Sequence, residues 1–380
     1  MKNNSNDPIR IAQIVGKWVG GGVEAVVMNY YRNIDRTRVQ FDFICDSDST
    51  NIPYEEIESL GGRVILIPPY QKVFSYQKEL KKVLCDGNYK IVHSHINALS
   101  FFPLMAAKNA KVPVRIAHSH STTNKVEWKK NLLKQVLKPL SKMYATDYFA
   151  CTEHAGRWLF GDKTFDDGKV FLMNNAIDLE KFKYNKNIRD SKREELKIDE
   201  KTLVVGHVGR FVQQKNHDYL IDIFNEYHKK NKNSILLLVG QGPLQEEIQN
   251  KVKDLKLDKS VKFLGQRNDV QELYQAFDVF LLPSLYEGLG VVLIEAQCAG
   301  CCCVASTEIP VIAKVTNNFE FLNLSDQPNV WADKISDVVN DYKRKDYVKE
   351  IAKNGYEIKN EVKKLEKKYN KFQNKKKVVI

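Results

Sequence analysis

The chain has no apolar run long enough to cross a membrane or to serve as a secretory signal. Its longest apolar stretches, such as ILLLV at 235–239, have the length of a single strand, whereas a membrane span needs about 20 residues. The opening MKNNSNDPIRIAQIV contains no signal-type apolar segment either. We therefore expect a cytoplasmic protein.

A disulfide framework is also missing. Seven cysteines are an odd number, and four of them crowd into CAGCCC at 298–303. Cys298 and Cys301 have the spacing of half a zinc site, but no second ligand pair follows at a suitable distance. We interpret the cluster as small buried side chains, placed where a helix runs into a strand, in a protein of a reducing compartment.

Motifs that identify nucleic-acid readers are absent as well. The 59 Lys and Arg residues exceed the 47 acidic residues and give a formal charge of +12, which suits nucleic acid, anionic lipid head groups or phosphorylated substrates. However, the chain has no helix-turn-helix, zinc-finger or aromatic–basic strand motif. Charge alone is a weak argument for a nucleic-acid-binding protein, and we expect none as a partner.

The glycine spacing of a nicotinamide-cofactor site is likewise not found. In WVGGGVEAVV, Gly21 and Gly22 precede a predicted helix and leave room for a bulky ligand or a phosphate. In LVGQGPLQ, Gly240 and Gly242 allow close approach of the backbone to a ligand, although a plain strand–helix turn explains them equally well. Neither stretch has the Gly-x-Gly-x-x-Gly pattern.

What the chain does contain is an alternation of strands and helices, repeated twice. Its 380 residues are too many for one ordinary core. Strands that are apolar on both faces and separated by helices predict an α/β protein with two Rossmann-like, doubly wound parallel-sheet domains, whose ligands bind at the carboxyl ends of strands in an interdomain cleft. The predicted strands are 9–15, 41–46, 63–68, 90–95 and 114–120, then 202–210, 234–240, 261–265, 279–284 and 301–306.

The domain boundary is expected at the polar, charged stretch 185–201, after which the pattern restarts. This places an N-terminal domain at 1–184, a C-terminal domain at 185–355, and a basic helix with a tail at 356–380.

A cationic loop follows the first strand of the second series, in VGRFVQQKNHDYL at 208–220. Arg210 and Lys215 are predicted to lie at the carboxyl edge of the sheet, next to a helix that Asn216 opens as its N-cap. Cations beside free backbone N–H groups suit a diphosphate. The alternative is a solvated loop with ordinary surface cations.

Two HSH triplets each close a strand of the first series, and strand alternation puts both histidines of a triplet on one face. The four are His93, His95, His118 and His120. They could bind a metal, or they could line the cleft and bind a sugar or move a proton. The Asp46-x-Asp48 pair resembles a metal motif, but we interpret it as turn chemistry.

The stretch LYEGLGVVLIE at 285–295 carries two glutamates, Glu287 in a glycine-broken turn and Glu295 in the helix that follows. If all eight steps were helical, the two would stand about 12 Å apart, whereas glycosidase carboxylates work at about 5–9.5 Å across one bond. The spacing favours two ends of a long ligand. A nucleotide-sugar fits, with one carboxylate on the ribose, the other on the hexose, and the helix N-terminus facing the phosphates. A surface glutamate and an interior-helix glutamate are the alternative.

Several of these stretches together resemble the retaining glycosyltransferases of family 4, which have the GT-B fold of two Rossmann-like domains. SLYEGLGVVLIEAQCAG is similar to the family's glutamate–seven–glutamate signature, and VGRFVQQKNHDYLIDIF to its Arg…Lys diphosphate segment. FLGQRNDVQELYQAFDVFLLPS, VPVRIAHSHST and LMNNAIDLEKF resemble further family segments in the correct order. The resemblance covers nearly the whole chain and is closest to the branch found in bacterial capsule and exopolysaccharide clusters.

The resemblance implies roles for individual residues. Arg210 and Lys215 would neutralise the departing diphosphate, Glu295 would bind the ribose, and Glu287 would hold the donor sugar. The backbone N–H groups of Gly288, Leu289 and Gly290 would assist Glu287. His118 or His120 would contact the donor sugar or the incoming hydroxyl, with the choice between them open, and Gly21 and Gly22 would lie near phosphate and acceptor. Where the branch commonly has Glu-Gly-Leu-Pro, this chain has Gly290, which makes the turn less rigid.

The implied activity is transfer of a hexosyl or N-acetylhexosaminyl group from a nucleotide-sugar, a UDP-sugar being favoured, to a lipid-linked saccharide, without a metal or other cofactor. The period of KKNLLKQVLKPLSK at 129–142 is that of a basic helix, which can lie on an anionic membrane or simply be solvated. Alternative functions are a sugar-nucleotide epimerase or hydrolase of the same fold and a zinc hydrolase built on the histidines.

Overall fold

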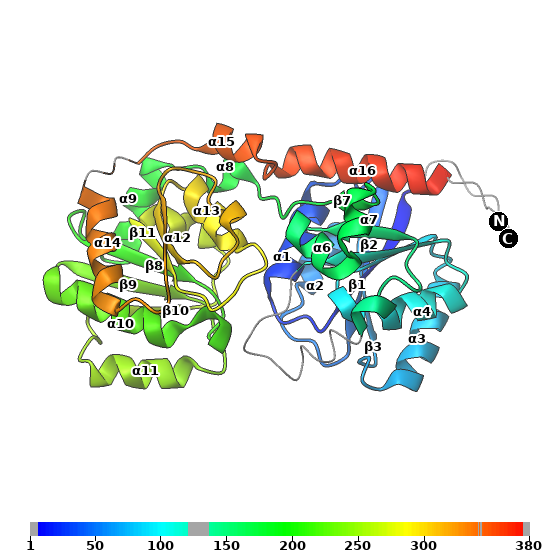
Figure 1. Cartoon of the computed structure of the whole chain (residues 1–380), viewed down its shortest axis with the longest axis horizontal. Helices are drawn as coiled ribbons and strands as arrows, with labels where there is room; N and C mark the ends of the chain where they lie inside the picture. Colours follow the sequence, from blue (N-terminus) through cyan, green and yellow to red (C-terminus); the bar gives the residue numbers. More distant parts are fainter. Residues whose placement is uncertain (1–6, 121–136, 341, 343, 375–380) are drawn as a thin grey trace. The chain divides into compact units, whose positions relative to one another are not determined.

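A computed structural model describes residues 7–120, 137–340, 342 and 344–374 of the chain. Residue contacts divide it into two units. Unit 1 extends to Ala176 and resumes at Ile358, and unit 2 comprises Ile177–Glu357. Each unit is an α/β layer structure around one parallel sheet (Figure 1).

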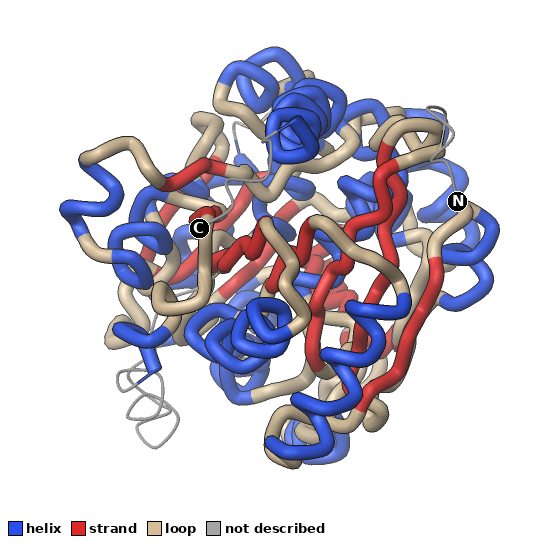
Figure 2. The backbone as a smooth tube through the Cα atoms, turned by 90° about the vertical axis from the view of Figure 1, so that its right-hand side faces the viewer, coloured by secondary structure: helices blue, strands red, loops and turns tan. Residues whose placement is uncertain are grey.

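The sheet of unit 1 is parallel throughout and has the order β3-β2-β1-β4-β5-β6-β7. Figure 2 shows its strands in red with helices packed around them. The strands are β1 (Ile9–Gly16), β2 (Val39–Asp46), β3 (Arg63–Ile67), β4 (Ile91–Ser94), β5 (Val114–Ser119), β6 (Asp147–Ala150) and β7 (Val170–Leu172). The helices are α1 (Gly22–Asn33), α2 (Tyr54–Ser59), α3 (Val73–Asp86), α4 (Phe101–Asn109), α6 (Glu153–Phe160), α7 (Asp162–Asp166) and α16 (Ile358–Asn374), with a 3-10 turn η1 (Asn97–Ser100).

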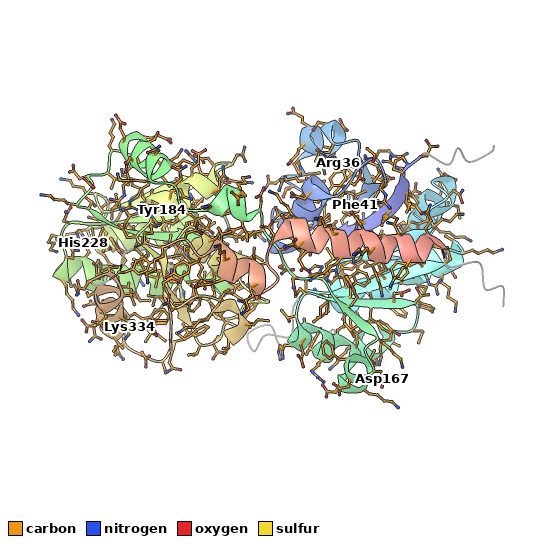
Figure 3. The ribbon with its side chains drawn as sticks, turned by 90° about the horizontal axis from the view of Figure 1, so that it is seen from above. Arg36, Phe41, Asp167, Tyr184, His228 and Lys334 are labelled. Atoms are coloured by element: carbon orange, nitrogen blue, oxygen red, sulfur yellow. The ribbon has the colours of Figure 1, made fainter. Side chains whose placement is uncertain are left out.

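The two faces of this sheet differ in chemistry because side chains alternate along each strand. Ala12, Val92 and Ala117 point into an apolar core that α3, α4 and α6 complete. The opposite face carries aromatic and polar side chains, among them His93, which Tyr369 of α16 contacts. Figure 3 shows α16 lying over this unit beside Phe41.

Helix α16 is therefore part of unit 1, although the whole of unit 2 lies between it and β7 in the sequence. Val362, Leu365, Tyr369 and Phe372 are buried, and they recur at helical spacing, which gives α16 one apolar face. The sequence predicts a boundary at 184/185 and a separate segment 356–380. In the structure the first unit ends eight residues earlier, at Ala176, and includes α16.

The sheet of unit 2 is also parallel, with the order β10-β9-β8-β11-β12-β13. Its strands are β8 (Leu203–Val208), β9 (Ser234–Val239), β10 (Val261–Gly265), β11 (Val279–Leu282), β12 (Cys302–Ser306) and β13 (Phe319–Leu322). Its helices are α8 (Leu179–Phe182), α9 (Lys186–Glu195), α10 (His217–Lys230), α11 (Gln245–Asp254), α12 (Val270–Ala276), α13 (Val291–Cys298), α14 (Pro328–Asn340) and α15 (Val348–Lys353), with 3-10 turns η2 (Gln213–Lys215) and η3 (Val311–Ala313).

Both faces of this second sheet are buried, as its continuous apolar strands predict. Leu236 and Leu238 of β9 belong to a core shared with α10, α11 and α14. Leu237 belongs to the core on the other face, with α8, α12, α13 and α15. Cys298, Cys301, Cys302 and Cys303 are buried free thiols in these cores. This confirms the interpretation of CAGCCC as small interior side chains.

The doubly wound parallel arrangement predicted from the sequence is confirmed in both units. Each sheet reverses its winding direction at its first strand, between β1 and β4 in unit 1 and between β8 and β11 in unit 2. Ligands of open parallel sheets bind at such switch points, outside the carboxyl ends of the strands.

Candidate functional site

Lys215 and Glu287 meet at the switch point of unit 2. Lys215 ends η2, on the segment that follows β8, and Glu287 lies on the segment that follows β11. The Lys215 Nζ atom is 2.6 Å from Glu287 Oε1, and the two side chains are only 15% and 8% exposed. The sequence had assigned these residues to different parts of a ligand, and the structure shows that they form one ion pair.

Gln214 completes the junction between these two segments. Its Nε2 donates to the Tyr286 carbonyl at 3.0 Å and to Glu287 Oε2 at 3.3 Å, and its own carbonyl accepts from the Leu285 N–H at 2.8 Å. Glu287 is thus held by two side chains from the β8 loop. Sequence reasoning missed Gln214, because nothing in its neighbourhood shows that the β8 and β11 loops are adjacent.

The turn after Glu287 presents backbone donors. Within the described chain, the N–H groups of Gly288, Leu289 and Gly290 have no acceptor. They lead into the N-terminus of α13, where the helix dipole is positive. Gly290 has φ +77°, a left-handed conformation that proline, with its fixed negative φ, cannot adopt. The turn in this chain therefore differs in geometry from the turn of relatives that have proline at this position.

Arg210 and Asn216 flank Lys215. The Arg210 side chain is exposed and makes no hydrogen bond or ion pair with other described residues, so its guanidinium is available to an anion. Asn216 is the N-cap residue of α10, as predicted, but it has φ +54° and makes no side-chain cap bond. Its amide instead donates to the Pro283 carbonyl at 3.1 Å, which adds a third link between the β8 and β11 segments.

Gly240 and Gly242 have a packing role that the sequence did not reveal. A Cβ atom at Gly240 would lie 2.2 Å from the Gly209 carbonyl oxygen, and one at Gly242 would lie 2.5 Å from the Phe211 carbonyl oxygen. The two glycines therefore let the β9 loop press against the backbone of the loop that carries Arg210. Direct contact of these glycines with a ligand stays a prediction.

Glu295 lies on α13, eight residues after Glu287 in the sequence. The Tyr274 hydroxyl donates to its Oε2 at 2.8 Å. Burial raises the pKa of Glu295 from 4.5 to about 7, against the opposing effects of the Tyr274 hydrogen bond and of Lys181 and Lys215. This carboxyl can therefore change protonation near neutral pH, and as a carboxylate it can accept hydrogen bonds from hydroxyl groups.

In unit 1, a glycine-rich segment leads from β1 into α1, and the carboxylate of Glu24 lies at the start of this helix. Gly21 is the N-cap residue of α1, and Glu24 Oε1 accepts from the Val19 N–H at 3.0 Å. A Cβ at Gly21 would meet Glu24 Oε2 at 2.9 Å, whereas a Cβ at Gly22 would find nothing within 4 Å. The open space is therefore beside Gly22. Glu24 makes this helix start less suited to a phosphate than the one in unit 2.

The four histidines of the HSH triplets form one buried cluster at the carboxyl ends of β4 and β5. His93 Nε2 lies 3.0 Å from His118 Nδ1, and His95 Nδ1 lies 2.9 Å from His120 Nε2. The rings of His118 and His120 stack with centroids 3.8 Å apart. All four are at most 5% exposed. Burial lowers their pKa values, well below 6.5 for three of them and to about 3 for His120.

A metal would have to displace hydrogen bonds to enter this cluster. One ring nitrogen from each of His93, His95 and His118 lies within 4.8 Å of the other two, a spacing that could hold a metal ion. Apart from His118 Nε2, which has no partner within the described residues, these nitrogens are already hydrogen-bonded to one another, to His120, to Gln13 or to Tyr369. The Asp46-x-Asp48 pair belongs to a turn, in which Asp48 pairs with Lys17 at 2.6 Å.

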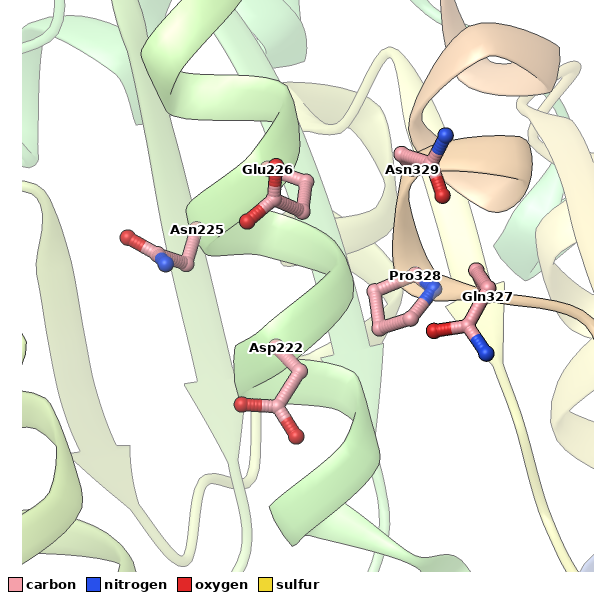
Figure 4. Close-up of a pocket in the computed structure, with 6 residues that line it drawn as sticks. All are labelled: Asp222, Asn225, Glu226, Gln327, Pro328 and Asn329. Carbon is pink, nitrogen blue, oxygen red and sulfur yellow. The ribbon is translucent and has the colours of Figure 1, made fainter.

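A hollow between α10 and α14 of unit 2 (Figure 4) lies away from these residues. It is lined by Asp222, Asn225, Glu226, Gln327, Pro328 and Asn329. Two carboxylates and no cation line it, so a diphosphate would be repelled there. The hollow is therefore not the candidate site.

Comparison with known proteins places the chain among sugar-transferring enzymes. A model described as Glycosyltransferase Family 4 matches residues 20–181, and one described as Glycosyl transferases group 1 matches residues 188–356. EpsF of Bacillus subtilis strain 168, which bears a glycosyltransferase name, is 36% identical over 368 residues, covering 93% of this chain and 94% of EpsF.

More distant relatives have more specific names. A UDP-Gal:alpha-D-GlcNAc-diphosphoundecaprenol alpha-1,3-galactosyltransferase of Escherichia coli is 27% identical, covering 83% of this chain and 84% of the relative. The capsular polysaccharide biosynthesis glycosyltransferase CapH of Staphylococcus aureus is 26% identical, covering 87% of this chain and 91% of CapH.

Among solved structures, Anabaena HepE in complex with UDP and glucose superimposes with a TM-score of 0.79 at 18% identity, covering 96% of this chain and all of HepE. At this level of identity the likeness shows the fold, which is GT-B.

Proposed function

The chain belongs to glycosyltransferase family 4 and is a glycosyltransferase, and from this premise we propose that it moves a hexosyl or N-acetylhexosaminyl group from a UDP-sugar to a lipid-linked saccharide in capsule or exopolysaccharide synthesis. The names of the relatives support the finer parts of this proposal. HepE was crystallised with UDP-glucose, and the Escherichia coli relative is named for UDP-Gal and a diphosphoundecaprenol-linked acceptor.

The observation that carries the proposal is the pairing of Lys215 with Glu287 at the switch point of unit 2. A sugar diphosphate needs cations and N–H donors at one end and hydroxyl acceptors at the other. Lys215, the free guanidinium of Arg210 and the N–H groups of Gly288–Gly290 supply the first set. Glu287 and Glu295 supply the second.

In the proposed reaction, the bond between the anomeric carbon and the phosphate oxygen breaks, and negative charge builds on the UDP leaving group. Arg210, Lys215 and the N–H groups of the 288–290 turn stabilise that charge, which is usually the largest contribution to catalysis of this kind. Glu287 accepts a hydrogen bond from a sugar hydroxyl, and its ion pair with Lys215 holds it in position. The ribose hydroxyls donate to Glu295.

We propose retention of configuration, with the acceptor hydroxyl entering on the face that the phosphate leaves. The carboxylate of Glu287 is engaged by Lys215 and Gln214, which suits a binding role better than attack on carbon. His118 or His120 remains the proposed contact of the donor sugar or of the incoming hydroxyl. No metal is required in this scheme, because two side-chain cations face the diphosphate.

Peripheral membrane attachment at the cytoplasmic face is part of the proposal, since the acceptor carries a lipid. None of the helices in the described residues is both long and apolar enough to cross a bilayer. The basic stretch 129–142 lies largely outside the described residues. Flotation with anionic liposomes at low salt tests the attachment, and a protein that stays at the bottom of the gradient argues against it.

Activity is tested with purified protein, a panel of nucleotide-sugars and a diphosphoundecaprenol-linked saccharide. We expect acceptor-dependent release of UDP, a product one sugar longer with retained anomeric configuration, and no loss on adding a chelator. Release or epimerisation of the sugar without acceptor would instead indicate the GT-B epimerase or hydrolase. Loss of all activity with chelator would indicate a metal enzyme.

A further inference from the structure

The histidine cluster of unit 1 is connected to one amide, the side chain of Gln13 on β1. Gln13 lies beside His93 in the parallel register of β1 and β4, on the sheet face that α16 covers. Its Oε1 is 2.7 Å from His95 Nε2, and its Nε2 is 3.4 Å from the Tyr369 hydroxyl. The Tyr369 hydroxyl is in turn 2.7 Å from His93 Nδ1. Two chains of hydrogen bonds therefore start at the same amide.

A neutral imidazole has one N–H donor and one bare nitrogen acceptor, so each link of such a chain determines the next. The four histidines are neutral at pH 7, because burial lowers their pKa values far below that pH. An amide has the complementary property, with an oxygen that only accepts and a nitrogen that only donates.

In the first chain, the Gln13 oxygen can only accept, so His95 carries its proton on Nε2. His95 Nδ1 is then bare and accepts from His120 Nε2–H at 2.9 Å. His120 is left with a bare Nδ1, and this atom has no hydrogen-bond partner within the described residues.

In the second chain, the Gln13 nitrogen donates to the Tyr369 oxygen, and the Tyr369 hydroxyl donates to His93 Nδ1. His93 therefore carries its proton on Nε2 and donates to His118 Nδ1 at 3.0 Å. His118 is left with an Nε2–H donor, which also has no partner within the described residues.

We propose that the amide of Gln13, acting on one chain through Tyr369, holds all four histidines in the Nε2–H tautomer, so that His118 ends in an N–H donor and His120 in a bare acceptor nitrogen. Gln13 and Tyr369 are positioning residues. The opposite orientation of the amide would reverse every link and place all four protons on Nδ1. The cluster is thus a two-state system set at one residue.

The consequence for transfer rests on the proposed function. His118 can only donate a hydrogen bond, which suits an oxygen of the donor sugar. His120 can only accept one, which suits the hydroxyl of the acceptor. The roles of the two stacked histidines, which the sequence left interchangeable, are therefore opposite.

The tautomers are measurable on the free protein, without substrate, by ¹⁵N NMR of histidine-labelled protein at pH 7, with peaks assigned from single substitutions. Protonated and bare ring nitrogens have well separated shifts. We expect His93, His95, His118 and His120 to show the Nε2–H pattern. His207 is an internal reference of the other form, because its Nδ1 donates to the Leu281 carbonyl at 2.8 Å. An Nδ1–H or averaged pattern for any of the four would overturn the proposal, whether or not the protein transfers sugar.

Two substitutions test the cause. A carboxylate only accepts, so Gln13→Glu turns the Tyr369 hydroxyl toward residue 13. His93 and His118 are then expected to move to the Nδ1–H form, while His95 and His120 keep Nε2–H. Unchanged tautomers of His93 and His118 in this variant would refute control by Gln13.

Tyr369→Phe provides an independent test should Gln13→Glu not fold. It removes the donor to His93, so His93 and His118 are expected to lose their single tautomer, while His95 and His120 keep theirs. Its matched control is Tyr30→Phe, which removes a buried hydroxyl that donates to the Asn174 carbonyl at 2.7 Å and not to a histidine, and should change none of the four. Retention of a single Nε2–H form by His93 in Tyr369→Phe would equally overturn the proposal.

Discussion

Lys215 combines two tasks at the level of a single residue, since its ammonium pairs with Glu287 and also faces the place proposed for the diphosphate. In the proposed reaction, negative charge grows near an ammonium that is already fixed in position. Such a fixed charge acts without reorganisation during the reaction, and this makes it effective in catalysis.

Replacing Lys215 by alanine is expected to lower kcat by about 10²–10³-fold while the protein remains folded, because Gln214 still holds the segment. The control is Lys251→Ala, which removes a lysine paired with Asp218 and Asp222 on the surface of α10. Turnover of Lys251→Ala should match the wild type. Sugar transfer by Lys215→Ala at the wild-type rate would contradict the proposal that Lys215 stabilises the departing phosphate.

Glu295 makes stability depend on pH in a specific direction. Its pKa is raised by burial from 4.5 to about 7, so between these pH values the folded protein keeps a proton that the unfolded chain releases. The associated stability is fully present below pH 4.5 and is lost as pH rises to about 7.

Glu295→Gln removes this dependence, so its Tm relative to the wild type should be higher at pH 8 than at pH 5. Glu320→Gln on β13 is the control and should differ from the wild type equally at both pH values. In the wild type, the KM for the donor should rise below pH 7, because a protonated carboxyl is a poorer acceptor for ribose hydroxyls. Identical pH profiles of Tm for Glu295→Gln and the wild type would mean that Glu295 is ionised throughout.

At the level of elements, the turn that leads into α13 depends on the left-handed conformation of Gly290. A Cβ at this position would also lie 3.2 Å from Leu293 Cδ1. Gly290→Ala is expected to cost about 1–2 kcal/mol of stability and to raise the donor KM, because the N–H groups of the 288–290 turn shift. Gly290→Pro should abolish transfer.

Gly168→Ala is the matched control for this turn. Gly168 has a similar φ of +67° but stands in open space in unit 1, so its substitution should cost similar stability and leave the donor KM unchanged. If Gly290→Ala affected only stability, the turn would not bind the donor.

Sequence patterns predicted the central strands and one edge strand of each sheet, β3 and β10, and they missed β6, β7 and β13 at the opposite edges. The strands β6, β7 and β13 have three or four residues each, too few for an alternation pattern to be recognised. Among site residues, Arg210, Lys215 and Glu287 were found because each follows a strand. The Lys215–Glu287 pair was not, because strand order, which makes β8 and β11 neighbours, is a tertiary property. For the same reason, nothing in the sequence around Tyr369 indicates that Tyr369 contacts His93.

At the level of the whole molecule, the two units differ in continuity. Unit 2 is one uninterrupted segment whose own helices cover both faces of its sheet. Unit 1 needs α16 to cover its second face. Without α16, unit 1 loses the burial of five apolar side chains, Ile358, Val362, Leu365, Tyr369 and Phe372, each contributing about 1.5–3 kcal/mol. The sum is comparable with the 5–15 kcal/mol by which a domain is typically stable.

The fragment Ile177–Glu357 is therefore expected to unfold cooperatively in urea and to retain UDP binding in calorimetry. Residues 7–176 alone should lack a cooperative transition and regain one when joined to the α16 segment by a flexible linker. A cooperative transition of 7–176 without α16 would show that the helix is dispensable for the fold of unit 1.

Because α16 belongs to unit 1 but follows unit 2 in the sequence, unit 1 can be completed only after unit 2 has been synthesised. Ribosomes deliver β1 and Gln13 first, then the whole of unit 2, and only afterwards Tyr369. Until that residue emerges, His93 lacks its hydroxyl partner and one sheet face lacks its cover. A nascent chain whose unit 2 is already complete therefore still carries an unfinished unit 1, and α16, translated after unit 2, completes both its core and its histidine chain.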